Sequence, residues 1–150
     1  MDFKGAELVR ADRGTVFAYI TDPRNFSSGI PDIQKVEVLD QDRFRVVAKL
    51  GVSVIRASFD IVFTISDRVQ PSHVRLKGHG LGGGSAVDLE IAIDLSEEGA
   101  QTLLSWKSDA KVSGTLASLG QRVLSTVADR LVNEVFSSVR SSLETNKNTG

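Results

Sequence analysis

Residues 113–144, SGTLASLGQRVLSTVADRLVNEVFSSVRSSLE, decide the fold. Apolar residues recur here every three or four positions, which is the period of one face of an α-helix. The stripe consists of Leu116, Leu119, Val123, Val127, Leu131, Val135, Val139 and Leu143, widened by Leu124, Val132 and Phe136. A helix of this length is long for a globular protein. It predicts an element large enough to cover a whole sheet.

The preceding residues alternate with period two, which is typical of half-buried strands. We expect one strand near the N-terminus and six more in residues 35–40, 42–50, 54–65, 73–80, 86–95 and 102–112. Asp12 and Asp22-Pro23 each indicate the start of a short helix between the first two strands. Short turns between consecutive strands favour an antiparallel meander. The prediction is a single α+β domain, residues 1–144, in which a curved antiparallel sheet of about seven strands grips the long helix. Residues 145–150 are expected to form a polar tail.

Composition narrows the classes of function. The chain of 150 residues has no Cys, which excludes disulfides, thiolate metal sites and Cys nucleophiles. Its 18 basic and 19 acidic residues are scattered, so nucleic acid is not an expected partner. No apolar run has the length of a signal peptide core or a membrane span. A soluble cytoplasmic protein without an integral membrane segment is expected.

Gly78, Gly80 and Gly83 match the G-x-G-x-x-G spacing of dinucleotide-binding loops. That loop binds a pyrophosphate only where a helix follows it. Here residues 86–95, AVDLEIAIDL, alternate as a strand. The glycines are therefore interpreted as a turn that also lets the sheet bend.

The polar residues form no recognisable catalytic set. His73 and His79 share the solvent-facing parity of their strand with Arg75 and Lys77. Glu7 is the one carboxylate that can face inward, and a rim position is expected because a buried lone carboxylate is costly. We therefore predict no catalytic residue, no metal and no cofactor.

Four blocks carry a family resemblance: VFAYITDP (16–23), IPDIQKVEV (30–38), GHGLGGGSA (78–86) and WKSDAKVSGTLASLGQRVLSTVADRLVNEVF (106–136). The last block is the most specific. The chain resembles the G-subunit family of carbon monoxide dehydrogenase, within the START-like, birch-pollen-allergen-like helix-grip superfamily of polyketide cyclase and lipid transport type. The resemblance implies an accessory role beside a molybdenum-containing carbon monoxide dehydrogenase or a related hydroxylase. It also implies membrane recruitment of that enzyme and a cavity for a quinone-like lipid.

Two departures from the family pattern stand out. Asp32 occupies a position where the family usually has Gly. Some members carry a long C-terminal extension that can anchor to a membrane, whereas this chain ends in TNKNTG. Direct anchoring is therefore not expected, and peripheral contact with a membrane stays open.

The expected ligand site consists of inward-facing apolar residues between sheet and helix. These are Phe17, Ile20, Phe26, Ile30, Phe44, Val46, Ala48, Phe59, Ile61, Phe63, Leu76, Gly78, Leu89, Ile91, Leu104, Trp106, Leu116, Leu119, Gly120, Val123 and Val127. Periodicity alone does not separate cavity lining from packed core. Three hypotheses follow: a non-catalytic binding protein for a lipid or quinone-like molecule, a cyclase or dehydratase of the same superfamily, and a ligand-free adaptor with a filled core.

Overall fold

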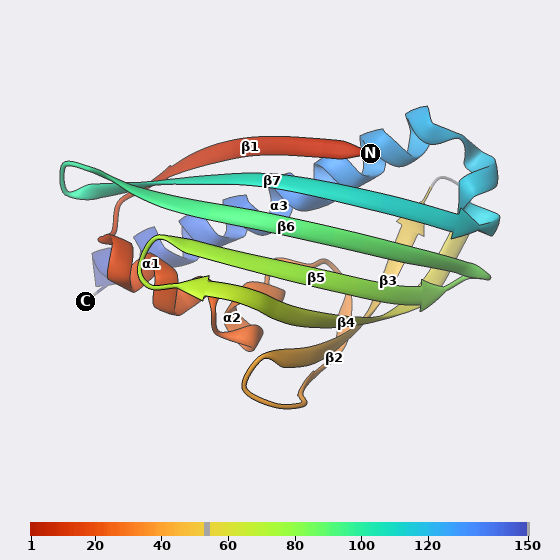
Figure 1. The fold of residues 1–150 in the computed structure, drawn as a ribbon, viewed down its shortest axis with the longest axis horizontal. Helices are drawn as coiled ribbons and strands as arrows, with labels where there is room; N and C mark the ends of the chain where they lie inside the picture. The colour runs from red at the N-terminus through yellow and green to blue at the C-terminus, as the bar shows by residue number, and fades with distance from the viewer. Residues whose placement is uncertain (53–54, 150) are drawn as a thin grey trace.

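Seven strands form one antiparallel sheet in the order β1-β7-β6-β5-β4-β3-β2, and this sheet curves around a long C-terminal helix (Figure 1). The computed structural model describes residues 1–52 and 55–149. The elements are β1 (Asp2–Val9), α1 (Arg13–Ile20), α2 (Pro23–Ser27), β2 (Ile33–Val38), β3 (Arg43–Val52), β4 (Ile55–Val69), β5 (His73–Gly82), β6 (Ser85–Glu98), β7 (Gln101–Gly114), the 3₁₀ helix η1 (Thr115–Leu119) and α3 (Gln121–Thr149). The predicted helix-grip architecture is confirmed.

Period-two alternation places apolar side chains on the concave face of the sheet, toward α3. On β3, for example, Phe44, Val46 and Ala48 are buried, whereas Lys49 is exposed. The β5–β6 connection contains Gly83 and Gly84, both with positive φ. The predicted turn is therefore confirmed at Gly83 and Gly84, whereas Gly78 and Gly80 lie within β5.

Both short helices begin at the predicted caps. The Asp12 carboxylate accepts a hydrogen bond from the Thr15 N–H at 3.2 Å, and the Thr15 hydroxyl bond to Asp12 lowers the pKa of this carboxyl. The Asp22 carboxylate accepts from the Arg24 N–H at 2.9 Å, with Pro23 in the first turn. In Figure 1, α1 lies beside the C-terminal end of α3. It contacts α3, β6 and β7, and α2 contacts α3 and β2.

The long helix begins later than the periodicity predicts. Residues 115–119 form η1, and α3 starts at Gln121 after Gly120, whose φ is 90°. This residue separates Leu116 and Leu119 from the face of α3. Within α3, Leu124 is buried, whereas Val123, one turn before the half-buried Val127, is 38% exposed. The predicted inward position of Val123 is wrong, while the stripe from Leu124 onward is confirmed.

Candidate functional site

The space between sheet and helix has two unlike halves. The half nearer α1 is filled by close-packed side chains. Val9, Val74, Ile93, Leu104 and Val139 are at most 1% exposed there. We call this region the filled half. It provides packing and leaves no room for a ligand at these positions.

The other half contains an apolar cleft of about 180 Å³, between the N-terminal part of α3 and the ends of the strands that face it. Its lining consists of Met1, Phe3, Leu50, Phe59, Ile61, Gly80, Val87, Leu89, Ile91, Ser108, Ala110, Val112, Leu116, Leu124, Val127, Ala128, Leu131 and Val132. Among these described residues, Ser108 alone has a polar side chain. None of these side chains is titratable, and the Met1 ammonium group donates to the Ala110 carbonyl at 2.8 Å.

Five aromatic rings form a connected chain on the side of the packed cluster that faces the cleft, and we call them the aromatic wall. Trp106 stacks on Phe136 at 4.3 Å between ring centroids, and Phe136 meets Phe26 edge-on at 6.4 Å. Phe26 also meets Phe63 edge-on at 6.1 Å, and Phe63 stacks on Phe44 at 5.1 Å. The wall thus connects β7, α3, α2, β4 and β3 without a break.

Trp106 is fixed in this wall by a glycine on the neighbouring strand. Gly5 pairs with Trp106 in the β1–β7 register, and a Cβ on Gly5 would lie only 2.2 Å from the Trp106 Cζ2 atom. The indole therefore lies directly on the β1 backbone. Its Nε1 is buried and has no hydrogen-bond partner among the described residues. Trp106 does not itself line the cleft.

The structure divides the predicted site residues into groups. Six line the cleft: Phe59, Ile61, Leu89, Ile91, Leu116 and Val127. Nine others belong to the packed core around the filled half, namely Phe17, Ile20, Phe26, Phe44, Val46, Phe63, Leu76, Leu104 and Trp106, and Ile30 packs against them. Leu119 packs against the smaller cluster of Phe59, Leu116 and Leu124. Ala48 and Gly78 are buried outside the cleft lining, and Gly120 and Val123 are exposed.

Sequence reasoning missed twelve lining residues: Met1, Phe3, Leu50, Gly80, Val87, Ser108, Ala110, Val112, Leu124, Ala128, Leu131 and Val132. Many of them share a strand parity with residues that were chosen. Ser108, Ala110 and Val112, for instance, continue the inward row of Trp106 on β7. Parity identified the inward face correctly, but not the part of that face that borders empty space.

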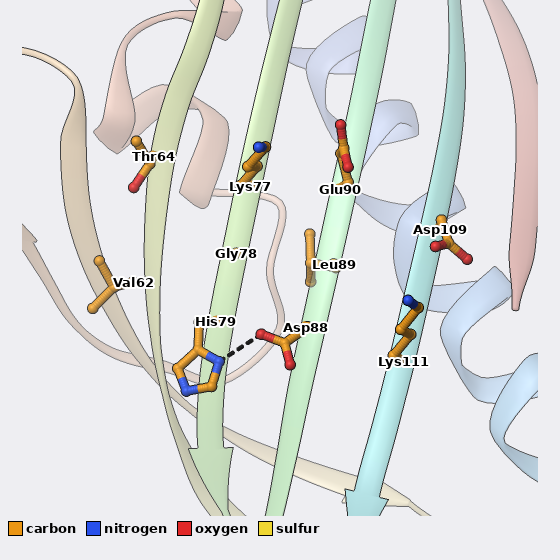
Figure 2. Close-up of a pocket in the computed structure, with 10 residues that line it drawn as sticks. All are labelled: Val62, Thr64, Lys77, Gly78, His79, Asp88, Leu89, Glu90, Asp109 and Lys111. Carbon is orange, nitrogen blue, oxygen red and sulfur yellow. Dashed lines mark hydrogen bonds and ion pairs between the residues drawn. The ribbon is translucent and has the colours of Figure 1, made fainter.

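A larger hollow of about 380 Å³ lies on the convex face of the sheet (Figure 2). Charged side chains from adjacent strands surround it, and the His79 Nδ1 lies 2.6 Å from the Asp88 Oδ1. Arg75 binds Glu90 at 2.6 Å just beyond it. These residues bridge β5 and β6, as the predicted outward parity of His79 requires. The described residues contain no cluster of His, Cys, Asp or Glu that could hold a metal ion. This hollow is open to solvent, and pairs of oppositely charged or polar side chains between β5 and β6 lie along it.

Glu7 lies at the edge of the sheet, where it joins β1 to α3. Its carboxylate accepts hydrogen bonds from the Ser137 hydroxyl at 3.1 Å and from the Arg140 guanidinium at 3.2 Å. The bond to Glu7 raises the pKa of Arg140. The expected rim position is therefore correct. Glu7 is outside the cleft lining, and its contacts give it a structural role.

Comparisons with known proteins agree with this architecture. A family model described as the G-subunit of carbon monoxide dehydrogenase (CoxG) matches residues 5–144. A conserved protein from Geobacillus kaustophilus is 25% identical, with 97% of this chain and 96% of that chain covered and a TM-score of 0.89. A START superfamily protein from Mycobacterium smegmatis is 12% identical over 96% of this chain and 97% of that chain, with a TM-score of 0.73. The Zhui aromatase/cyclase from Streptomyces sp. R1128 is 14% identical over 96% and 93%, with a TM-score of 0.68. No curated protein matches the sequence.

Proposed function

The chain belongs to the CoxG family, the G-subunit family of carbon monoxide dehydrogenase, and from this premise we propose that it is a non-catalytic protein that binds an apolar molecule in the cleft. The apolar lining carries the proposal, because Ser108 alone among the described lining residues has a polar side chain. Such a surface favours hydrocarbon and offers almost no hydrogen bonds to a polar group. A polar end of the ligand therefore stays at the mouth.

The size of the cleft bounds the affinity. A volume of about 180 Å³ holds about six groups of roughly 30 Å³, the volume of one water. Burial of about six methylenes at about 0.8 kcal/mol each is worth about 5 kcal/mol before the entropic cost of association. Because that cost is at least about 4 kcal/mol, the cleft as it stands supports only weak binding.

We further propose that the ligand is a lipid or quinone-like molecule, and that the protein is accessory to a molybdenum-containing carbon monoxide dehydrogenase or related hydroxylase in the cytoplasm. Family membership supports the enzyme partner, and the apolar lining supports the ligand class. Among the helices of the described residues, none is long and apolar enough to cross a membrane.

A cyclase or dehydratase is a weaker alternative. The likeness to an aromatase/cyclase extends to the fold alone at 14% identity. Cyclisation and dehydration require groups that move protons at the reacting atoms. The described lining supplies one hydroxyl and no titratable side chain. A ligand-free adaptor is disfavoured by the cleft itself.

The test uses Trp106, the only tryptophan, as a probe at the inner end of the cleft. A bromine quenches indole emission on close approach. If the hydrocarbon end of the ligand enters the cleft ahead of its hydroxyl, 6-bromo-1-hexanol should quench Trp106 saturably. The isomer 2-bromo-1-hexanol, whose bromine stays near the hydroxyl, should quench Trp106 much less. A quinone with a short isoprenoid tail should compete with the bromoalcohol, and a tail-less quinone should not.

Ala128→Leu fills the cleft from α3 and should weaken the quenching. Ala92→Leu, on the convex face of β6, adds the same atoms away from the cleft and serves as the matched control. Quenching that is linear in concentration, or equal for both bromine positions and both variants, would show that the cleft does not bind apolar chains.

A further inference from the structure

The aromatic wall lies where an inserted chain would end. We infer that the wall is a specificity determinant that limits the length of apolar chain the cleft accepts. This inference rests on the proposed function and specifies its ligand class: a narrow hydrocarbon end of about six carbons, the number of water-sized groups that fit the volume.

The first argument is position along each element. On β7 every lining residue follows Trp106, and on β4 every lining residue precedes Phe63. On α3 the lining ends at Val132, one turn before Phe136. The lining therefore stays on one side of the wall on these elements, although they are far apart in sequence.

The second argument is continuity. Each ring of the wall contacts the next, from Trp106 on β7 through the rings of α3 and α2 to Phe44 on β3. Edge-to-face and stacked rings at these separations are favourable contacts. The wall therefore runs from β7 over α3 and α2 to β4 and β3, at the end of the cleft nearer α1.

The third argument is the support of the wall from behind. Gly5 leaves no space for the Trp106 ring to move toward β1, because the ring already occupies the site of a Cβ. Phe136 and Val139 are each 1% exposed, so α3 is fully packed at and beyond the wall. Displacing a ring would require repacking of the filled half, which close-packed interiors resist.

A hard inner limit gives a specific dependence of affinity on chain length. Each methylene that enters the cleft strengthens binding about fourfold, the ratio that corresponds to one buried CH₂. Carbons beyond the capacity of the cleft stay at the mouth and contribute little. The affinity should rise through about six carbons and then become flat.

The experiment is an NMR titration of the full chain with straight-chain 1-alkanols from butanol to decanol. In the unaltered protein we expect the affinity to stop rising near hexanol, and we call the chain length at which this happens the break. Phe136→Leu shortens one ring of the wall and should move the break to longer alkanols by one or two carbons. Phe17→Leu removes the same atoms from a buried ring of α1 outside the wall, and should leave the break unchanged.

A second variant measures the capacity of the cleft independently of the wall. Ala110→Leu fills the cleft from β7 and should move the break to shorter alkanols by two or three carbons. Saturable binding that strengthens steadily through decanol, or a break that Phe136→Leu leaves in place whether or not Ala110→Leu moves it, would overturn the wall as the limit and leave the binding function intact. An absence of saturable binding at every length would overturn the binding function itself.

Discussion

Truncating one valine in each half of the interior measures how unequally the two halves are packed. Val139 lies in the filled half and is 1% exposed. Val127 lines the cleft and is only half-buried. Both are on α3, so Val→Ala changes intrinsic helix propensity equally at the two sites.

The magnitudes follow from the surroundings. At Val139 two buried methyl groups are worth about 1.6 kcal/mol, and the cavity left behind adds about 1 kcal/mol. The better helix propensity of Ala returns about 0.5 kcal/mol, for a net loss near 2 kcal/mol. At Val127 the methyl groups already border empty space, so roughly half of the transfer term is lost and no new cavity forms. The net effect there is within about 0.5 kcal/mol of zero.

Urea unfolding followed by far-UV circular dichroism separates these values. With a slope near 2 kcal/mol per molar urea, Val139→Ala should lower the midpoint by about 1 M, and Val127→Ala by less than about 0.3 M. Unchanged slopes would show that both variants unfold in the same two-state manner. Equal midpoint shifts would mean that the interior is uniformly packed, and the division into filled half and cleft would be wrong.

Three further substitutions test local features. Gly5→Ala should destabilise the fold by about 1–3 kcal/mol through overpacking against Trp106 and shift the Trp106 emission. Gly51→Ala should do neither, because a Cβ there would meet no described residue closer than Arg56 at 3.9 Å. Asp32 has a φ of 52°, the only positive value among the described non-glycine residues, so Asp32→Gly should raise the thermal midpoint and Asp32→Val should lower it. Asp12 has a pKa below its ordinary value of about 3.9. Its ionised form therefore contributes fully to the free energy of unfolding above that pH, and this contribution is lost as the pH falls through the folded-state pKa. Asp12→Asn should therefore flatten the stability profile in that acid range while keeping the helix cap, and an unchanged acid profile would contradict this origin.

The outline of the fold was predictable because each element obeys its own period. The alternation on β3 and β7 gave the correct inward residues, and the stripe on α3 gave the correct helix face from Leu124 onward. The break at Gly120 was not predicted, since the residues on both sides of it are spaced as one helix would space them. The positive φ of Gly120, which ends η1 before α3 begins, is a property of the folded chain.

The site was less predictable than the fold for a physical reason. Parity tells which face a residue occupies, but whether that face meets another side chain depends on the distance between two elements. Phe63 and Ile61 share one parity on β4, and yet Phe63 packs in the wall while Ile61 lines the cleft. The positive φ of Asp32, by contrast, fits the expectation of Gly at that position drawn from the resemblance, because a left-handed backbone favours Gly.

The nearly pure hydrocarbon lining has a consequence for how such a site changes in evolution. Hydrogen bonds specify a ligand by direction and by chemical group, and a site built from them must change several residues together to accept a new molecule. The contacts offered by this lining are non-directional and scale with area. One substitution at Ala110 or Ala128 can therefore change the size of ligand that fits the cleft, while the rest of the lining still contacts hydrocarbon. A protein with such a lining selects its ligands by shape and accepts a range of them. Its specificity can change gradually, one substitution at a time.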